Sequence, residues 1–291
     1  MDRETLRVVP LGHALGAELQ GVDITRPLGK SIFNAIRSAW HEHHVIVFRD
    51  VNWTVAEHLR FSAHFGTLDT HDATPHDRLD GQPEILEVTN KPKNGQPSQT
   101  RNAGRNWHSD YSYTAYPAAA SMLFCDEVPS VGGDTMFCNM VRAYETLSPK
   151  MRGIVDSLES VFDFNLVSGT AERDPQKMEE LLRLNPPIAH PAVRVHPGSG
   201  KRALYVSHRT SHFEGMRRSE SLPLINYLCE LATKAENVYR HRWRTGDLVC
   251  WDNRTTMHIA LADFDPSEPR RMLRTTLKGA RSGVEVAPAL D

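Results

Sequence analysis

The stretch NWHSDYSY, residues 106–113, places a histidine and an aspartate two positions apart between aromatic residues. In an extended chain, residues i and i+2 face the same side, so His108 and Asp110 would point toward one place. Two neutral imidazoles and one carboxylate are a ligand set that Fe(II) takes on one face of its octahedron, leaving adjacent positions open. The pair therefore indicates either half of a metal site or an ordinary buried hydrogen bond.

A second histidine ligand has to come from a distant part of the chain. The best candidate is His258 in the apolar run TMHIAL, where an unpaired imidazole is otherwise costly. His71 and His76 flank a loop, and the sequence leaves open whether their side chains lie near a site or face solvent. We expect three of the remaining histidines, at a helix end, to face solvent (His41, His43 and His44). Three more are expected to be surface or hydrogen-bonded residues (His190, His196 and His241).

Downstream of His258, the stretch RRMLRTTLKG carries a second chemical signal. On a strand, Arg270 and Arg274 project to one side and Arg271 to the other. Burying two guanidinium groups is expensive unless anions meet them, and the arginine fork matches a carboxylate. The region predicts an anion receptor beside a metal ligand, unless both arginines are surface residues of an edge strand.

The elements that must position these residues are short strands and amphipathic helices. Strand-length apolar runs include VIVFRD, PEILEVTN and AAASMLFCDEV, and GSGK between two strand-like runs is a hairpin signal. TVAEHLRFSAHFG has helical spacing, with Thr54 as its cap. This pattern predicts a single domain, residues 1–291, mainly β with flanking α and a jelly-roll core. The polar segment 91–105, just before His108, is a candidate active-site lid.

Composition excludes several classes of partner. The 291 residues contain 34 Lys+Arg and 36 Asp+Glu, a net charge of −2, which gives no electrostatic reason to expect nucleic acid or an anionic membrane. No apolar run is long enough to span a bilayer, and the N-terminus lacks the apolar region of a signal peptide. Four scattered cysteines indicate reduced thiols in a cytoplasmic protein. Helices outside the core leave a homo-oligomer open.

Four motifs in order, WHSD, GGDT, WDNRTTMH and RRMLRTTLKG, resemble the Fe(II)- and 2-oxoglutarate-dependent dioxygenases of the taurine dioxygenase and 2,4-dichlorophenoxyacetate dioxygenase family. The similarity runs from LGAELQGVD to LKG. It implies a double-stranded β-helix core, one ferrous ion, 2-oxoglutarate and dioxygen. It also implies hydroxylation of a small organic anion, such as a sulfonate, a phenoxyalkanoate or a similar carboxylate, with release of succinate and carbon dioxide.

The resemblance also implies roles for individual residues. His108, Asp110 and His258 match the iron ligands, and Thr135 and Arg270 match the residues that hold the distal carboxylate of 2-oxoglutarate. Substrate contacts are implied for His71, Gly104, Thr210, Trp251 and Arg274. Thr74, Gly104 and Thr210 stand where taurine enzymes have tyrosine, asparagine and phenylalanine, so a roomier pocket and a substrate other than taurine are expected.

Two other functions draw on the same residues. A zinc-dependent hydrolase with the same three ligands would need a general base and would leave the arginine pair without a purpose. A non-catalytic β-sandwich that binds a small anion would not need all three ligands. Oxygen uptake that depends on ferrous ion and 2-oxoglutarate distinguishes the dioxygenase from both.

Overall fold

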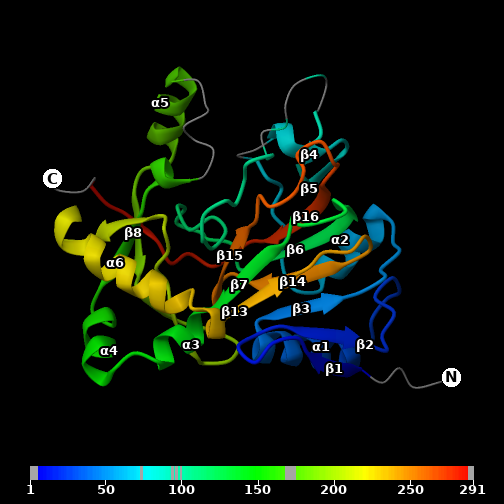
Figure 1. Ribbon diagram of the computed structural model, residues 1–291, viewed down its shortest axis with the longest axis horizontal. Coiled ribbons are helices and arrows are strands. Elements are labelled where there is room, and N and C mark those ends of the chain that lie inside the picture. Colours follow the sequence, from blue (N-terminus) through cyan, green and yellow to red (C-terminus); the bar gives the residue numbers. More distant parts are fainter. Residues whose placement is uncertain are drawn as a thin grey trace.

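The computed structural model describes residues 6–72, 75–92, 95, 98, 100–167 and 175–287 (Figure 1). Of the sequence expectations, Thr74 and part of the 91–105 segment lie outside the described residues. The helices are α1 (Lys30–His43), α2 (Val55–Ala63), α3 (Met140–Glu145), α4 (Pro149–Val155), α5 (Pro175–Leu184) and α6 (Arg218–Ala232), with 3₁₀ turns η1 (Pro75–Asp77), η2 (Phe164–Leu166) and η4 (Ala235–Asn237).

The strands form a large sheet, a small sheet and two accessory sheets. In spatial order, the large sheet holds β1 (Arg7–Pro10), β2 (Ala17–Gln20), β3 (Val45–Phe48), β14 (Leu248–Asp252), β6 (Ala120–Glu127), β16 (Arg271–Leu277), β5 (Gln82–Thr89) and β4 (Arg78–Leu79). The small sheet holds β13 (Val238–His241), β7 (Thr135–Asn139) and β15 (Thr256–Ala260). The accessory sheets are β12 (Thr210–Phe213), β8 (Glu159–Phe162), β9 (Ile188–Pro191) and β17 (Val284–Glu285), and the pair β10 (Val193–Val195) and β11 (Arg202–Leu204).

The large and small sheets pack against each other, and helices cover their outer faces, as Figure 1 shows for α6 and α3 beside the small sheet. Strand β3 shows the reason for this layered packing, because its side chains alternate between two apolar layers. Val45 and Val47 pack toward Phe137 of the small sheet, whereas Ile46 and Phe48 pack in a second layer with α1 and α2. The two packed sheets with helices outside them form the mainly β core with flanking helices that the sequence predicts.

Local sequence signals explain several element boundaries. Helix α2 begins at a capping box, in which the Thr54 hydroxyl accepts from the Glu57 N–H at 3.3 Å and the Glu57 carboxylate accepts from the Thr54 N–H at 2.6 Å. The GSGK segment joins the antiparallel pair β10–β11, as predicted. Helices α3 and α4 are separate, because Ser148 caps a new helix whose first residue is Pro149.

Two sequence expectations are wrong. His44 does not face solvent, because the chain leaves α1 through a left-handed conformation at His44 (φ 64°) and enters β3, which turns the ring inward. The His44 side chain is buried, with Nδ1 3.0 Å from Thr255 Oγ1. The edge-strand alternative for the arginines also fails, because β16 lies between β5 and β6.

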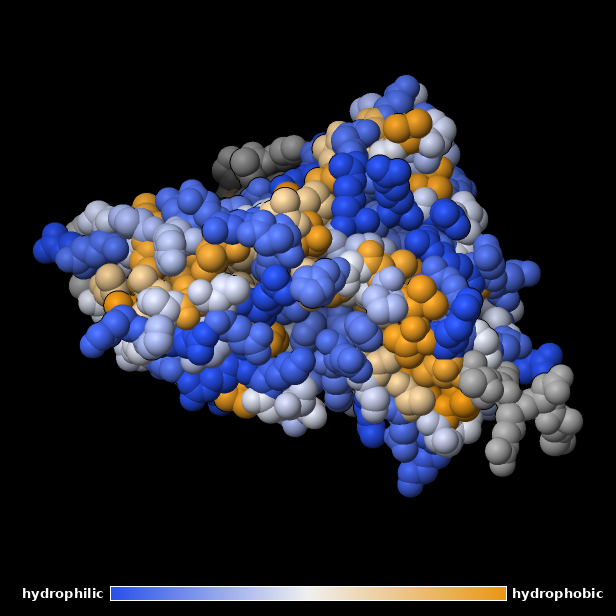
Figure 2. Space-filling view, turned by 60° about the horizontal axis from the view of Figure 1, so that its bottom comes forward, coloured by the Kyte–Doolittle hydropathy of each residue, from blue (hydrophilic) through white to orange (hydrophobic). Residues whose placement is uncertain are grey.

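The surface is mainly hydrophilic with apolar patches between the polar groups on the face seen in Figure 2. No helix within the described ranges combines the length and the hydropathy needed to cross a membrane. All four cysteines are free and buried.

Candidate metal centre

His108 and His258 meet across an isolated antiparallel bridge between the small sheet and the segment after residue 100. Their backbones exchange two hydrogen bonds, His108 N–H to His258 C=O at 3.1 Å and His258 N–H to His108 C=O at 2.8 Å. Asp110 follows in a turn, with Tyr111 at φ 55°. The predicted convergence is present, although the His108–Asp110 pair lies on a bridge and a turn and not on a regular strand.

The donor atoms of the three side chains form a compact group. His108 Nε2 lies 3.8 Å from Asp110 Oδ1, and His258 Nε2 lies 3.9 Å from Asp110 Oδ2, too far for hydrogen bonds. The carbonyl of Asn106 accepts from His108 Nδ1 at 2.7 Å, which leaves the Nε2 lone pair for a ligand. One ligand atom from each residue lies within 4.8 Å of the others, a donor set that suits a divalent ion such as Fe(II).

Burial keeps these groups in the protonation states that bind a metal. Burial, with the positive charge of Arg209, holds the pKa of His108 well below its usual range. Burial lowers the pKa of His258 to about 4. Burial alone would raise the pKa of Asp110, but Arg274, the two histidines and the Ser121 hydroxyl lower it overall. At neutral pH the site therefore holds two neutral imidazoles and one carboxylate.

Three polar residues hold Asp110 in place. Ser121 Oγ donates to Asp110 Oδ2 at 2.7 Å, and Asn253 Oδ1 accepts from the Asp110 N–H at 3.2 Å. Asn253 Nδ2 donates to Ser121 Oγ at 3.1 Å, which closes a ring of hydrogen bonds around the carboxylate. Arg274 Nη1 lies 3.2 Å from Asp110 Oδ1. Ser121 lies outside every motif, so the sequence gives no sign of its role, and Asn253 lies within WDNRTTMH, a motif that does not by itself indicate this contact.

Thr135 and Arg270 are both buried, on β7 and just before β16. Thr135 Oγ1 accepts from Trp243 Nε1 at 3.0 Å, and Arg270 Nε donates to the Gly133 carbonyl at 3.1 Å. No ion pair with a carboxylate is found for Arg270 within the described ranges, and burial lowers its pKa to about 10. Arg271 points elsewhere, as predicted, and pairs with Glu87 and Asp126.

The residues expected to contact substrate divide into two groups. His71, Gly104 and Trp251 surround the metal ligands. The His71 ring is buried, with Nδ1 3.0 Å from Tyr111 Oη and Nε2 without a partner. A Cβ at Gly104 would lie 3.3 Å from His108 Cε1, and the Trp251 ring centroid lies 4.8 Å from that of His258. Thr210 lies on another sheet, at the start of β12, and its hydroxyl accepts from the Ser207 N–H at 3.0 Å.

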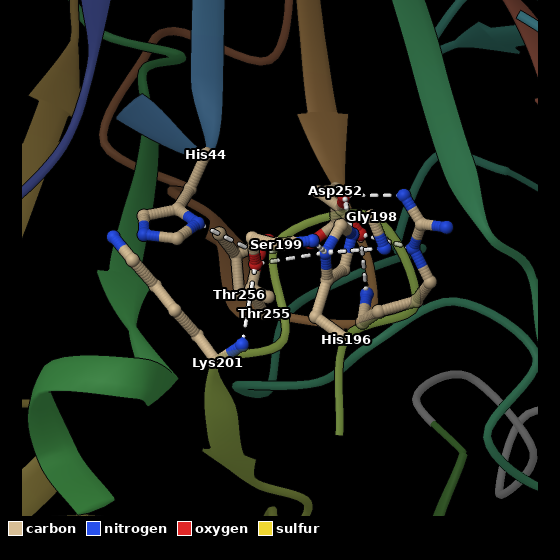
Figure 3. Close-up of polar contacts among 9 residues, drawn as sticks. His44, His196, Gly198, Ser199, Lys201, Asp252, Thr255 and Thr256 are labelled. Atoms are coloured by element: carbon tan, nitrogen blue, oxygen red, sulfur yellow. Dashed lines mark hydrogen bonds and ion pairs between the residues drawn. The ribbon is translucent and has the colours of Figure 1, made fainter. Parts of the chain in front are cut away.

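In a second cluster of possible ligands, His41, His196 and Asp252, hydrogen bonds occupy His196 and Asp252 (Figure 3), and the His41 ring packs edge-on against that of His196. His196 Nδ1 accepts from the Ser199 N–H at 2.9 Å, so the ring proton is on Nε2, which donates to Asp252 Oδ2 at 2.9 Å. Arg254 donates to both carboxylate oxygens, at 2.7 and 2.6 Å. Because these lone pairs are occupied, we assign the cluster to the support of the turn between β14 and β15.

Comparisons with known proteins agree with this geometry. Residues 7–276 match the family model described as "Taurine catabolism dioxygenase TauD, TfdA family". The chain is 32% identical over 276 residues to an alpha-ketoglutarate-dependent 2,4-dichlorophenoxyacetate dioxygenase of Cupriavidus pinatubonensis, covering 92% of this chain and 96% of that protein. It is 33% identical over 282 residues to an alpha-ketoglutarate-dependent sulfate ester dioxygenase of Pseudomonas putida, covering 94% of this chain and 90% of that protein.

Solved structures show the same similarity. A taurine dioxygenase from Burkholderia xenovorans superposes with a TM-score of 0.80 at 34% identity, covering 98% of this chain and 95% of that chain. The structure of AAD-2 in complex with Mn(II) and N-oxalylglycine superposes with a TM-score of 0.83 at 29% identity, covering 97% of this chain and 100% of that chain.

Proposed function

The chain belongs to the taurine catabolism dioxygenase TauD, TfdA family, and on that premise we propose that its pocket hydroxylates a small organic anion. The enzyme is an alpha-ketoglutarate-dependent dioxygenase that uses Fe(II), 2-oxoglutarate and dioxygen and releases succinate and carbon dioxide. The convergence of His108, Asp110 and His258 on one buried point is the observation that carries the proposal.

His108 Nε2, His258 Nε2 and one oxygen of Asp110 hold the ion. When bound, Fe(II) and 2-oxoglutarate supply the oxidising power that converts a substrate C–H bond into C–OH. The protein supplies ligands, orientation and a site from which water is excluded. This division of roles fits the burial of all three ligands, and no side chain has to act as a general acid or base.

Thr135 and Arg270 hold the distal carboxylate of 2-oxoglutarate. The burial of Arg270 without an acidic partner supports this role, since a buried guanidinium calls for an anion. A charge-assisted contact of this kind fixes the orientation of the co-substrate and selects it over shorter oxoacids.

Arg274 binds the anionic group of the substrate, with His71, Gly104, Thr210 and Trp251 as further pocket residues. The relatives support an anion of this type, because they are named for a phenoxyacetate, a sulfate ester, a phenoxypropionate and a sulfonate. Small residues at positions 104 and 210 favour a substrate larger than taurine.

We also propose the domain organisation, the cellular location and the assembly of the chain. The chain is one catalytic domain in which segment 91–105 serves as a lid, because this segment leads directly to His108. The four free, buried cysteines support a cytoplasmic location. A homo-oligomer is compatible with the helices on the outside of the core.

Oxygen uptake and succinate release, measured over a panel of sulfonates, sulfate esters and phenoxyalkanoates, test the proposal. We expect turnover that requires both Fe(II) and 2-oxoglutarate, and none with zinc. Asp110→Ala should abolish it while the circular dichroism spectrum is kept, and Arg270→Ala should mainly raise the KM for 2-oxoglutarate. Retained consumption of 2-oxoglutarate by purified His108→Ala would contradict the assignment of the ligands.

A further inference from the structure

Arg209 is a buried cation that forms no ion pair within the part of the chain that the structure describes. Its residue is only 4% exposed, yet its Nε has no hydrogen-bond partner and no carboxylate of the described chain forms an ion pair with it. The backbone of Arg209 is hydrogen-bonded, because its N–H donates to Ser207 Oγ at 3.1 Å. Burying a guanidinium with an unpaired Nε is costly, so among the described residues Arg209 still lacks an anion.

Arg209 lies beside the segment that follows the metal ligand Asp110. The Arg209 carbonyl accepts from the Asp163 N–H at 3.4 Å, and the next residue, Phe164, has its ring 5.0 Å from that of Tyr113. Tyr113 in turn is 6.3 Å from Tyr111, whose hydroxyl contacts His71. The aromatic row of Phe164, Tyr113 and Tyr111 therefore joins the surroundings of Arg209 to the residue that follows Asp110.

A second arginine faces the same region. Arg274 Nη1 lies 3.2 Å from Asp110 Oδ1, and its Cζ lies 6.0 Å from the Tyr111 ring centroid. Once Asp110 serves a divalent ion, its charge is shared, so Arg274 also requires an anion. Asp69, whose Oδ1 lies 3.8 Å from His71 Nδ1, has a side chain that is 27% exposed and therefore hydrated.

Charge counting for the loaded site gives the charge of the missing ligand. The divalent ion, Arg274 and Arg209 contribute +4, and Asp110 contributes −1. The keto-acid end of 2-oxoglutarate adds −1, while its distal carboxylate is neutralised by Arg270. The two histidines add no charge, because an imidazole binds a metal in its neutral form. The buried groups therefore leave +2 for the substrate to balance.

We propose that Arg209 is a second anion-binding residue of the substrate pocket and that the substrate is an organic dianion. One carboxylate, sulfonate or sulfate group binds Arg274, and a second oxyanion group binds Arg209. This inference rests on the proposed function and narrows its substrate class from organic anions to molecules with two acidic groups.

Matched probes that differ by one acidic group test the inference. We would compare phenoxyacetate with 4-carboxyphenoxyacetate, and hexyl sulfate with 6-sulfooxyhexanoate. Binding is followed by the change each probe causes in the visible absorption band of the anaerobic enzyme with Fe(II) and 2-oxoglutarate. We expect the dianion of at least one pair to bind about tenfold or more tightly than its monoanion, as loss of a charged hydrogen bond commonly costs.

Variants test whether the preference for the dianion depends on Arg209. Arg209→Gln should remove the preference for the dianion while leaving monoanion binding unchanged, and Arg209→Lys should restore part of it. Arg202→Gln, which removes a charge from an exposed pair with Asp156, should change nothing. Equal binding of both members of each pair to the unmodified enzyme overturns the inference, as does equal weakening of both by Arg209→Gln. Absence of the absorption band would instead count against the proposed function itself.

Discussion

Two opposing effects act on the pKa of Asp110. Its burial opposes ionisation, but Arg274, Ser121 and the backbone contact to Asn253 hold the carboxylate charged and fixed in orientation. Residues that orient a metal ligand commonly change metal affinity by 10- to 100-fold when they are removed. Ser121 and Asn253 therefore belong to the machinery of the site, although neither is a ligand.

Ser121→Ala should weaken Fe(II) binding by about tenfold, because Asp110 Oδ2 loses a donor at 2.7 Å and is freer to rotate. Anaerobic titration of the purified protein with Fe(II) measures the effect. Ser160→Ala is the matched control, since Ser160 is equally buried and its hydroxyl has no partner. If the two variants bind Fe(II) equally well, the positioning role of Ser121 is wrong.

At the scale of elements, the metal ligands are set by segments that approach one another from different parts of the chain. The turn from β14 to β15 supplies Asn253 and then His258, and it is supported by Asp252 with Arg254 and His196. The loop before His108 approaches β15 from the other side, where Gly104 C=O accepts from the Ala260 N–H at 2.8 Å.

Gly104→Ala should disturb this approach in two ways. A left-handed conformation (φ 74°) costs a residue with a Cβ about 1 kcal/mol, and the new methyl would lie 3.3 Å from His108 Cε1. Gly81→Ala is a close control, with the same φ of 74° and no atom within 4 Å of the added Cβ. We expect similar losses in urea unfolding free energy, but weaker Fe(II) binding only for Gly104→Ala. Unaltered metal affinity would show that the loop adjusts without moving His108.

At the scale of the whole molecule, the outstanding feature is the number of buried histidines. Burial lowers the pKa of His58 to about 3 and those of His44 and His190 to about 4. These rings serve the fold as neutral hydrogen-bonding groups: His190, for example, contacts Ser282 and the carbonyl of Ser112. Much of the histidine content thus belongs to the core and not to the metal centre.

Stability should fall as pH decreases from about 6.5 to 4. In this window the unfolded state binds protons that the buried histidines do not, so each contributes up to about 1.4 kcal/mol of lost stability per pH unit. Urea unfolding from pH 7 to 4.5 measures the slope. His58→Phe keeps the stacking on Trp53 and should reduce the slope by one proton. An unchanged slope in His58→Phe would refute the assignment.

The sequence alone was sufficient for the reaction class and much of the local structure. The order of its motifs indicated the family, and the spacing of apolar residues with Thr54 as a cap indicated α2. These features depend on neighbours in the chain or on the types of a few residues. The grouping of His108, Asp110 and His258 was anticipated, while their metal-binding role and the substrate contacts remain predictions for experiment.

Only the tertiary structure decided which charges are paired and which rings are buried. Arg274 meets Asp110 across 164 positions, and Asn253 meets Asp110 across 143, contacts that no local pattern encodes. The same applies to His44, turned inward by the path of the chain, and to Arg209, whose Nε is buried and has no hydrogen-bond partner among the described residues. Electrostatic energy depends on distance and burial in space, and therefore separation along the sequence cannot specify it.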